Sequence, residues 1–193
     1  MREIKIKRHS LFQAHIGMYQ TWWGYYSDYT EATSILIDAI NNNQPVHTIA
    51  TPLLFLIRHS LELGLKANIL ELEKISSAKP KLKFDGNSHQ LEFLHEYFIS
   101  HIDEIINKNI IDEDIIDEIT YYKTKLKNIK DILHKIDRGS YAFRYPINVK
   151  KNLSFDYLEI VNIEDCVMLL KEIDPFLLYT ISVFEDLGII KTE

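Results

Sequence analysis

The sequence predicts a mainly α-helical protein that folds as a helical bundle. Glycine and proline are few, with 6 and 5 among 193 residues, and long apolar stretches with helical spacing alternate with short polar breaks. In the most apolar stretch, residues 51–71, leucine and isoleucine would cover nearly every face of a helix. We therefore expect this stretch to be the central helix of a single domain that covers residues 1–193.

The composition is that of an acidic globular protein. Hydrophobic residues make up 46% of the chain, charged residues make up 26%, and the net charge is -6. Such a protein would need a local basic patch to bind a nucleic acid. No stretch resembles a signal peptide or an uncharged membrane span, so we expect a cytoplasmic protein without membrane contact.

Neither a metal nor a cofactor is expected. Cys166 is the single cysteine, which excludes an internal disulfide framework and a multi-cysteine zinc site. The histidines form no helical i, i+4 pair beside an acid, and no glycine-rich phosphate loop is present.

The N-terminal part is predicted to contain two helices after a flexible arm or short strand at residues 1–9. The first helix would cover residues 10–29 and the second residues 31–40, with the polar run from Asn41 to Pro45 ending it. Aromatic residues gather on one face of the first helix: Tyr19, Trp22, Trp23 and Tyr26. This face would pack on the core or on a second copy. Base stacking is the alternative, although interleaved lysine and arginine are absent.

The central helix would begin either near Val46 or at Pro52, because proline is tolerated in a first helical turn. A helix over residues 91–106, capped by Asn87 or Ser88, is expected next. A small irregular hairpin at residues 153–160 would precede the last helix.

The last helix has clear signals at both ends. Asn162 is the expected N-cap and Gly188 the expected end.

Residues 112–137 form the remaining predicted helix, with acidic residues in the first half and basic residues in the second. This distribution complements the helix dipole. It would also supply the local positive patch that an acidic protein needs to hold a phosphate chain. Lys123 and Lys127 are the candidate RNA or nucleotide contacts in that patch.

Polar residues form one narrow line along the central helix. Arg58, Glu62 and Lys66 recur every four positions, so they share a face inside an otherwise apolar helix. The line is either a ladder of ion pairs or one wall of a polar site. In the first case, Glu62 and Asp137 would also receive Arg144, and the loop that carries Arg144 would be pinned to the central helix.

Three segments resemble a pattern of the HEPN superfamily, the higher eukaryote and prokaryote nucleotide-binding domains. They are residues 58–66 (RHSLELGLK), 88–94 (SHQLEFL) and 143–146 (FRYP), together with Asp137 and Ser140. The resemblance is to prokaryotic helical proteins and extends over about residues 30–187.

The resemblance implies a helical bundle, a homodimer and a function in RNA or nucleotide binding. Many HEPN proteins are metal-independent ribonucleases of toxin-antitoxin, phage-defence and CRISPR systems, so it also implies a protein partner from such a system. Their signature is an arginine and a histidine with four to six residues between them. In this chain Arg8 to His15 fits the spacing, and the spacing is missing after Arg58 and Arg144.

RNA cleavage would require a base for the ribose 2′-hydroxyl, an acid for the leaving oxygen and a cation for the phosphate charge. Histidine suits the first two tasks and arginine the third. The candidate catalytic residues are Arg58, His59, His89 and Arg144, and Lys66 and Tyr145 are candidate phosphate or base contacts. The alternative is a noncatalytic helical module that docks a partner or a second copy.

Overall fold

The computed structural model describes residues 19–79, 81–85, 88–137, 140–148, 150–155 and 160–190. Helices of this part are α1 (Trp22–Asn41), α2 (Val46–Leu72), α3 (Leu91–Lys108), α4 (Glu113–Ile136) and α5 (Ile163–Asp186). The prediction of a mainly α-helical chain is confirmed. None of these helices is long and apolar enough to cross a membrane.

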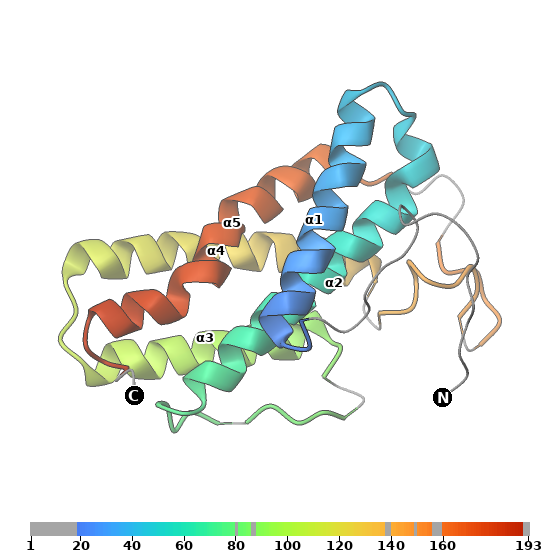
Figure 1. Cartoon of the computed structure of the whole chain (residues 1–193). Coiled ribbons are helices and arrows are strands. Elements are labelled where there is room, and N and C mark those ends of the chain that lie inside the picture. The colour runs from blue at the N-terminus through green and yellow to red at the C-terminus, as the bar shows by residue number, and fades with distance from the viewer. Residues whose placement is uncertain are drawn as a thin grey trace, which may run out of the picture.

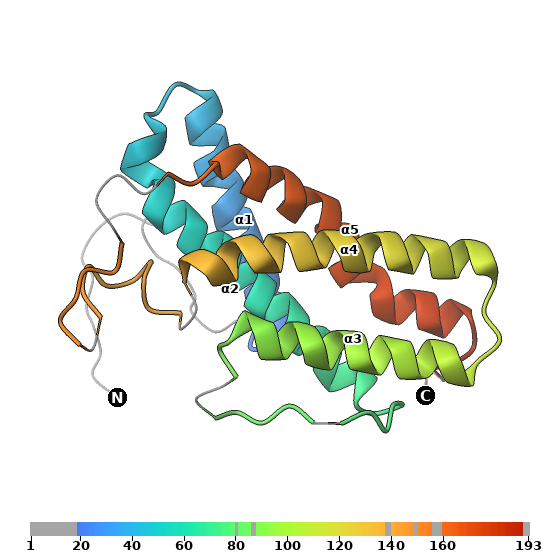
Figure 2. The ribbon, with the colours of Figure 1, turned by 180° about the vertical axis from the view of Figure 1, so that it is seen from behind.

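Helix α2 is the centre of the bundle. It contacts α1, α3 and α5, while α4 closes the bundle against α3 and α5 (Figure 1; Figure 2). Leu53, Leu61 and Leu65 on α2 are fully buried, as expected for a helix that is covered on all sides. All five helices contribute to one hydrophobic core, so this core fixes the position of the polar line on α2.

The predicted division into two helices at residue 30 is wrong within the described residues. A single helix, α1, runs through Thr30 because this residue does not break the helix: its hydroxyl donates to the carbonyl oxygen of Tyr26 at 2.8 Å. Helix α2 begins at Val46 and continues through Pro52, which is the first of the two predicted alternatives. Residues 1–9, and the Arg8 to His15 spacing, lie outside the described residues.

Two predicted connections differ from the structure. The N-cap of α3 is Gln90 and not Asn87 or Ser88. The Ser88 hydroxyl donates to the carbonyl oxygen of Asp85. The described part of residues 153–160 contains no strand, and its pairing is limited to an isolated antiparallel bridge between Ile147 and Leu153. The Asn162 cap of α5 is confirmed, because its side chain accepts from the Glu164 backbone N–H at 3.1 Å.

The aromatic face of α1 is divided between core and surface. Tyr26 is 2% exposed and its hydroxyl donates to Asp174 on α5, whereas Tyr19, which precedes α1, is exposed, as is the neighbouring Tyr25. Gly64 permits this packing: a Cβ at position 64 would lie 2.8 Å from Tyr26 Cε2. Core packing therefore accounts for part of this face only.

Candidate functional site

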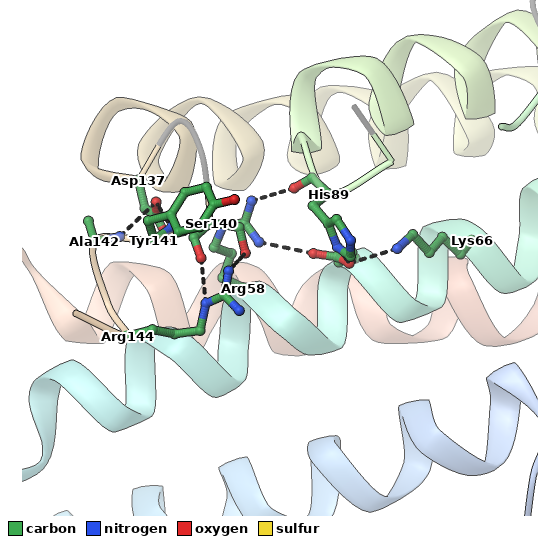
Figure 3. Close-up of polar contacts among 9 residues, drawn as sticks. Arg58, Lys66, His89, Asp137, Ser140, Tyr141, Ala142 and Arg144 are labelled. Atoms are coloured by element: carbon green, nitrogen blue, oxygen red, sulfur yellow. Dashed lines mark hydrogen bonds and ion pairs between the residues drawn. The ribbon is translucent and has the colours of Figure 1, made fainter. Parts of the chain in front are cut away.

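The polar line on α2 is centred on Glu62, whose side chain is 1% exposed. Glu62 Oε2 accepts from Arg58 NH1 at 3.1 Å, and Oε1 accepts from Lys66 Nζ at 2.7 Å (Figure 3). His89, just before α3, places its ring Nδ1 2.8 Å from Glu62 Oε1. We call Arg58, Glu62, Lys66, His89 and Asp137 the Glu62 cluster.

Arg58 connects three parts of the bundle. Its NH2 group donates to the His89 carbonyl oxygen at 2.6 Å, and its Nε lies 3.6 Å from Asp137 Oδ2, after the last residue of α4. The second distance is an ion pair but is too long for a hydrogen bond. Arg58 is 1% exposed, so its charge is neutralised entirely within the protein.

The carboxyl group of Glu62 is ionised at neutral pH. Burial raises its pKa, but the charge and hydrogen bond of Lys66, the hydrogen bond of His89 and the charge of Arg58 outweigh burial and lower it below the ordinary value. A buried carboxylate with donors on both oxygens satisfies the usual requirement for a buried charge.

His89 is the solvent-facing member of the Glu62 cluster. Its side chain is 57% exposed, while the Glu62 side chain behind it is 1% exposed. Because the Glu62 carboxylate is ionised and can only accept, Nδ1 of His89 carries the proton, and Nε2 of the neutral ring is the acceptor. A histidine held in one tautomer by a buried carboxylate is suited to general acid–base chemistry.

His59 packs among aromatic rings and has no ion-pair partner in the described part of the chain. Its ring meets Tyr29 edge-on at 4.4 Å and stacks on Phe55 at 5.6 Å between centroids. Burial lowers its pKa, with Lys66, Arg58 and Arg144 adding to this effect and Glu62 opposing it. The structure therefore places His59 as a neutral packing residue outside the Glu62 hydrogen bonds.

The expectation that Arg144 would reach Glu62 and Asp137 is wrong. Arg58 takes that place, because it stands one helical turn from Glu62 and also lies beside Asp137. Arg144 is exposed, and in the described part of the chain its hydrogen bonds go to Ser140: Nε donates to the carbonyl oxygen at 2.6 Å. Asp137 Oδ1 instead accepts the backbone N–H of Tyr141 at 2.8 Å.

The candidate lysines differ in their surroundings. Lys66 is buried, with Nζ 5.7 Å from the centre of the Trp22 ring. Lysines of the basic half of α4 pair with carboxylates outside the Glu62 cluster: Lys123 with Asp103, Lys125 with Glu172, Lys127 with Asp131, and Lys130 with Glu92 and Asp131. Much of the expected positive patch is therefore neutralised by neighbouring acids.

A second polar cluster, which periodicity did not indicate, joins the end of α2 to α3. Glu104 accepts hydrogen bonds from Ser76, Ser77, the Ala78 backbone N–H and Lys108. These donors lower the pKa of Glu104, with Lys108 having the largest effect. The buried His101 ring, with Nδ1 2.9 Å from the Ser76 hydroxyl, supports the same connection, so this cluster anchors the chain after α2.

The comparisons with known proteins leave the family open. No protein-family model, curated protein or solved structure matches the chain. Within the described residues, no group of three or more histidine, cysteine, aspartate or glutamate side chains could hold a metal ion.

His95 on α3 makes stability depend on pH. Burial, with a smaller effect of the Lys130 charge, lowers its pKa to about 4. An unfolded histidine has a pKa near 6.5, so the unfolded chain binds a proton first as the pH falls. We expect the free energy of unfolding to be highest above about pH 6.5 and to fall towards pH 4. Urea unfolding at a series of pH values measures this.

The variant His95→Gln isolates the contribution of His95. Glutamine does not titrate, so the variant should lose less stability than the wild type between pH 6.5 and pH 4.5. His47→Gln, at an exposed position on α2, is the control and should follow the wild type. If the free energy of unfolding fell equally steeply with pH in His95→Gln and in the wild type, His95 would not be the cause of the pH dependence.

Proposed function

We propose that this chain is a HEPN-like helical protein that binds RNA and cleaves it without a metal ion, with His89 as the general acid–base residue. The observation that carries the proposal is the exposed His89 ring on the buried, ionised Glu62 carboxylate. The resemblance of the segments around Arg58, His89 and Arg144 to HEPN sequences supports the choice of RNA as substrate.

In the proposed reaction, Nε2 of His89 takes the proton of a ribose 2′-hydroxyl. The freed oxygen attacks the neighbouring phosphorus, the bond from phosphorus to the 5′-oxygen breaks, and the leaving oxygen takes a proton. The products are a 2′,3′-cyclic phosphate and a 5′-hydroxyl end. Arg144 is an exposed cation for the phosphate, and a two-fold dimer would supply a second His89 as the acid.

The variant His89→Ala tests the proposal. RNA cleavage at pH 7 in the presence of a chelator should fall by about 10²–10⁴-fold, which is the usual contribution of an acid–base residue. Thermal unfolding of the variant verifies that the fold is retained, and His47→Ala is the matched exposed-histidine control on α2. Absence of wild-type cleavage, or a His89→Ala variant as active as the wild type, would refute the proposed ribonuclease.

A noncatalytic module that docks a partner or a second copy is the second candidate. The burial of Arg58, Glu62 and Lys66 favours it, because these side chains neutralise one another without a substrate. The exposed Tyr19, which precedes α1, and Tyr25 on α1 would then belong to the docking surface. This candidate requires no RNA cleavage, so the His89 assay separates the two.

A further inference from the structure

An exposed cluster of two tyrosines and an arginine lies on the loop after α4. Tyr141 and Tyr145 are each 53% exposed, and their ring centroids are 6.5 Å apart with an interplanar angle of 30°. The Arg144 guanidinium carbon lies 5.2 Å from the Tyr141 ring and 5.7 Å from the Tyr145 ring. We call Tyr141, Arg144 and Tyr145 the tyrosine platform.

The loop that presents the tyrosine platform is held at several points. Asp137 Oδ1 accepts the backbone N–H groups of Tyr141 and Ala142, at 2.8 and 3.1 Å, and Asp137 itself faces Arg58 (Figure 3). Phe143 points into the core at 6% exposure, where it meets Phe155. The exposed rings therefore stand on backbone that is already ordered, which lowers the entropic cost of binding.

Arg144 also differs electrostatically from the lysines of α4. The ion pairs in the described part of the chain join Lys123, Lys125, Lys127 and Lys130 to carboxylates, and they include none of Arg144. Its guanidinium lies on aromatic faces and is held by neutral oxygens of Ser140. A cation without a counter-ion is available to a phosphate.

We propose that the tyrosine platform binds single-stranded RNA, with unpaired bases stacked on Tyr141 and Tyr145 and a phosphate on Arg144. This inference rests on the proposed function and adds a strand preference to it. Aromatic faces beside a cation are the usual means of holding single strands, whereas duplex bases are stacked on one another and are not accessible to such rings. Arg58 and Asp137 link the platform to His89 through the Glu62 cluster.

Equilibrium binding tests the tyrosine platform. The protein carries His89→Ala so that the RNA stays intact, and the probe is a fluorescein-labelled twelve-nucleotide oligoadenylate read by anisotropy. Tyr141→Ala and Tyr145→Ala should each raise its Kd about tenfold, and Tyr→Phe at either position should bind within about twofold of the parent, because phenylalanine keeps the stacking face. Tyr121→Ala is the matched control, since Tyr121 is 50% exposed with Lys125 5.2 Å from its ring centre.

The outcomes separate the platform from the proposed ribonuclease. Equal affinity for a duplex of the same length, or unchanged Kd values for both alanine variants, would overturn the platform even if the wild type cleaves RNA. Tyrosine-dependent binding, together with no RNA cleavage by the wild type, would establish the platform and refute the ribonuclease. No binding of RNA of either form would overturn the platform.

Discussion

Glu62→Ala is expected to lower the free energy of unfolding by about 3–5 kcal/mol, the usual cost of removing one partner of a buried ion pair. The variant would leave the Arg58 guanidinium and the Lys66 ammonium buried at 1% and 3% exposure. Asp137 would remain near Arg58, but its Oδ2 lies 3.6 Å from Arg58 Nε and cannot replace the carboxylate between Arg58 and Lys66. Urea unfolding at pH 7 measures the loss.

Glu71→Ala on the same helix is the control for Glu62→Ala. Glu71 and its partner Lys74 have side chains that are 40% and 66% exposed, so this ion pair is screened by water. The expected loss is below about 1 kcal/mol. If Glu62→Ala cost no more than Glu71→Ala, the Glu62 cluster would not hold the bundle together.

Arg58→Lys should cost about 2–3 kcal/mol, although it keeps the positive charge. The guanidinium contacts the Glu62 carboxylate, the His89 carbonyl oxygen and Asp137 with three different nitrogen atoms. A lysine has a single nitrogen and cannot reach all three, so buried acceptors would lose their partner. Hydrogen exchange of the Tyr141 amide should also accelerate, because Asp137, which accepts that amide, would lose its contact with the Arg58 guanidinium.

The matched control is the same arginine-to-lysine substitution at an exposed position. Arg144→Lys should change the free energy of unfolding by less than about 0.5 kcal/mol, since surface substitutions rarely exceed this value. If Arg58→Lys and Arg144→Lys lowered the free energy of unfolding equally little, the three separate contacts of the Arg58 guanidinium would not be important for stability.

Periodicity was sufficient to predict the polar line and the ends of several helices. Arg58, Glu62 and Lys66 are four positions apart on one helix, and the observed Glu62 ion pairs follow from this spacing. Asn162 capping α5 and the span of α4 between Asp112 and Asp137 are equally local features. The predicted division between residues 29 and 31 was wrong, because the hydroxyl of Thr30 bonds to a carbonyl oxygen of its own helix and the helix continues through it.

The identity of the exposed site residues depended on tertiary structure. His59 and His89 are equivalent as residue types, but His59 packs on Tyr29 while His89 faces solvent on the Glu62 carboxylate. No sequence pattern indicates Tyr141 as a site residue, since its proposed role depends on a ring and a guanidinium that the loop brings together.

The sequence by itself determined the helical class, the buried central helix and the row of charges on it, because each depends on residues within a few turns of one another. The choice of Arg58 over Arg144 as the partner of Asp137 was decided by tertiary structure alone. That choice depends on where the end of α4 meets α2, and the position is set by packing of the shared core rather than by any local pattern.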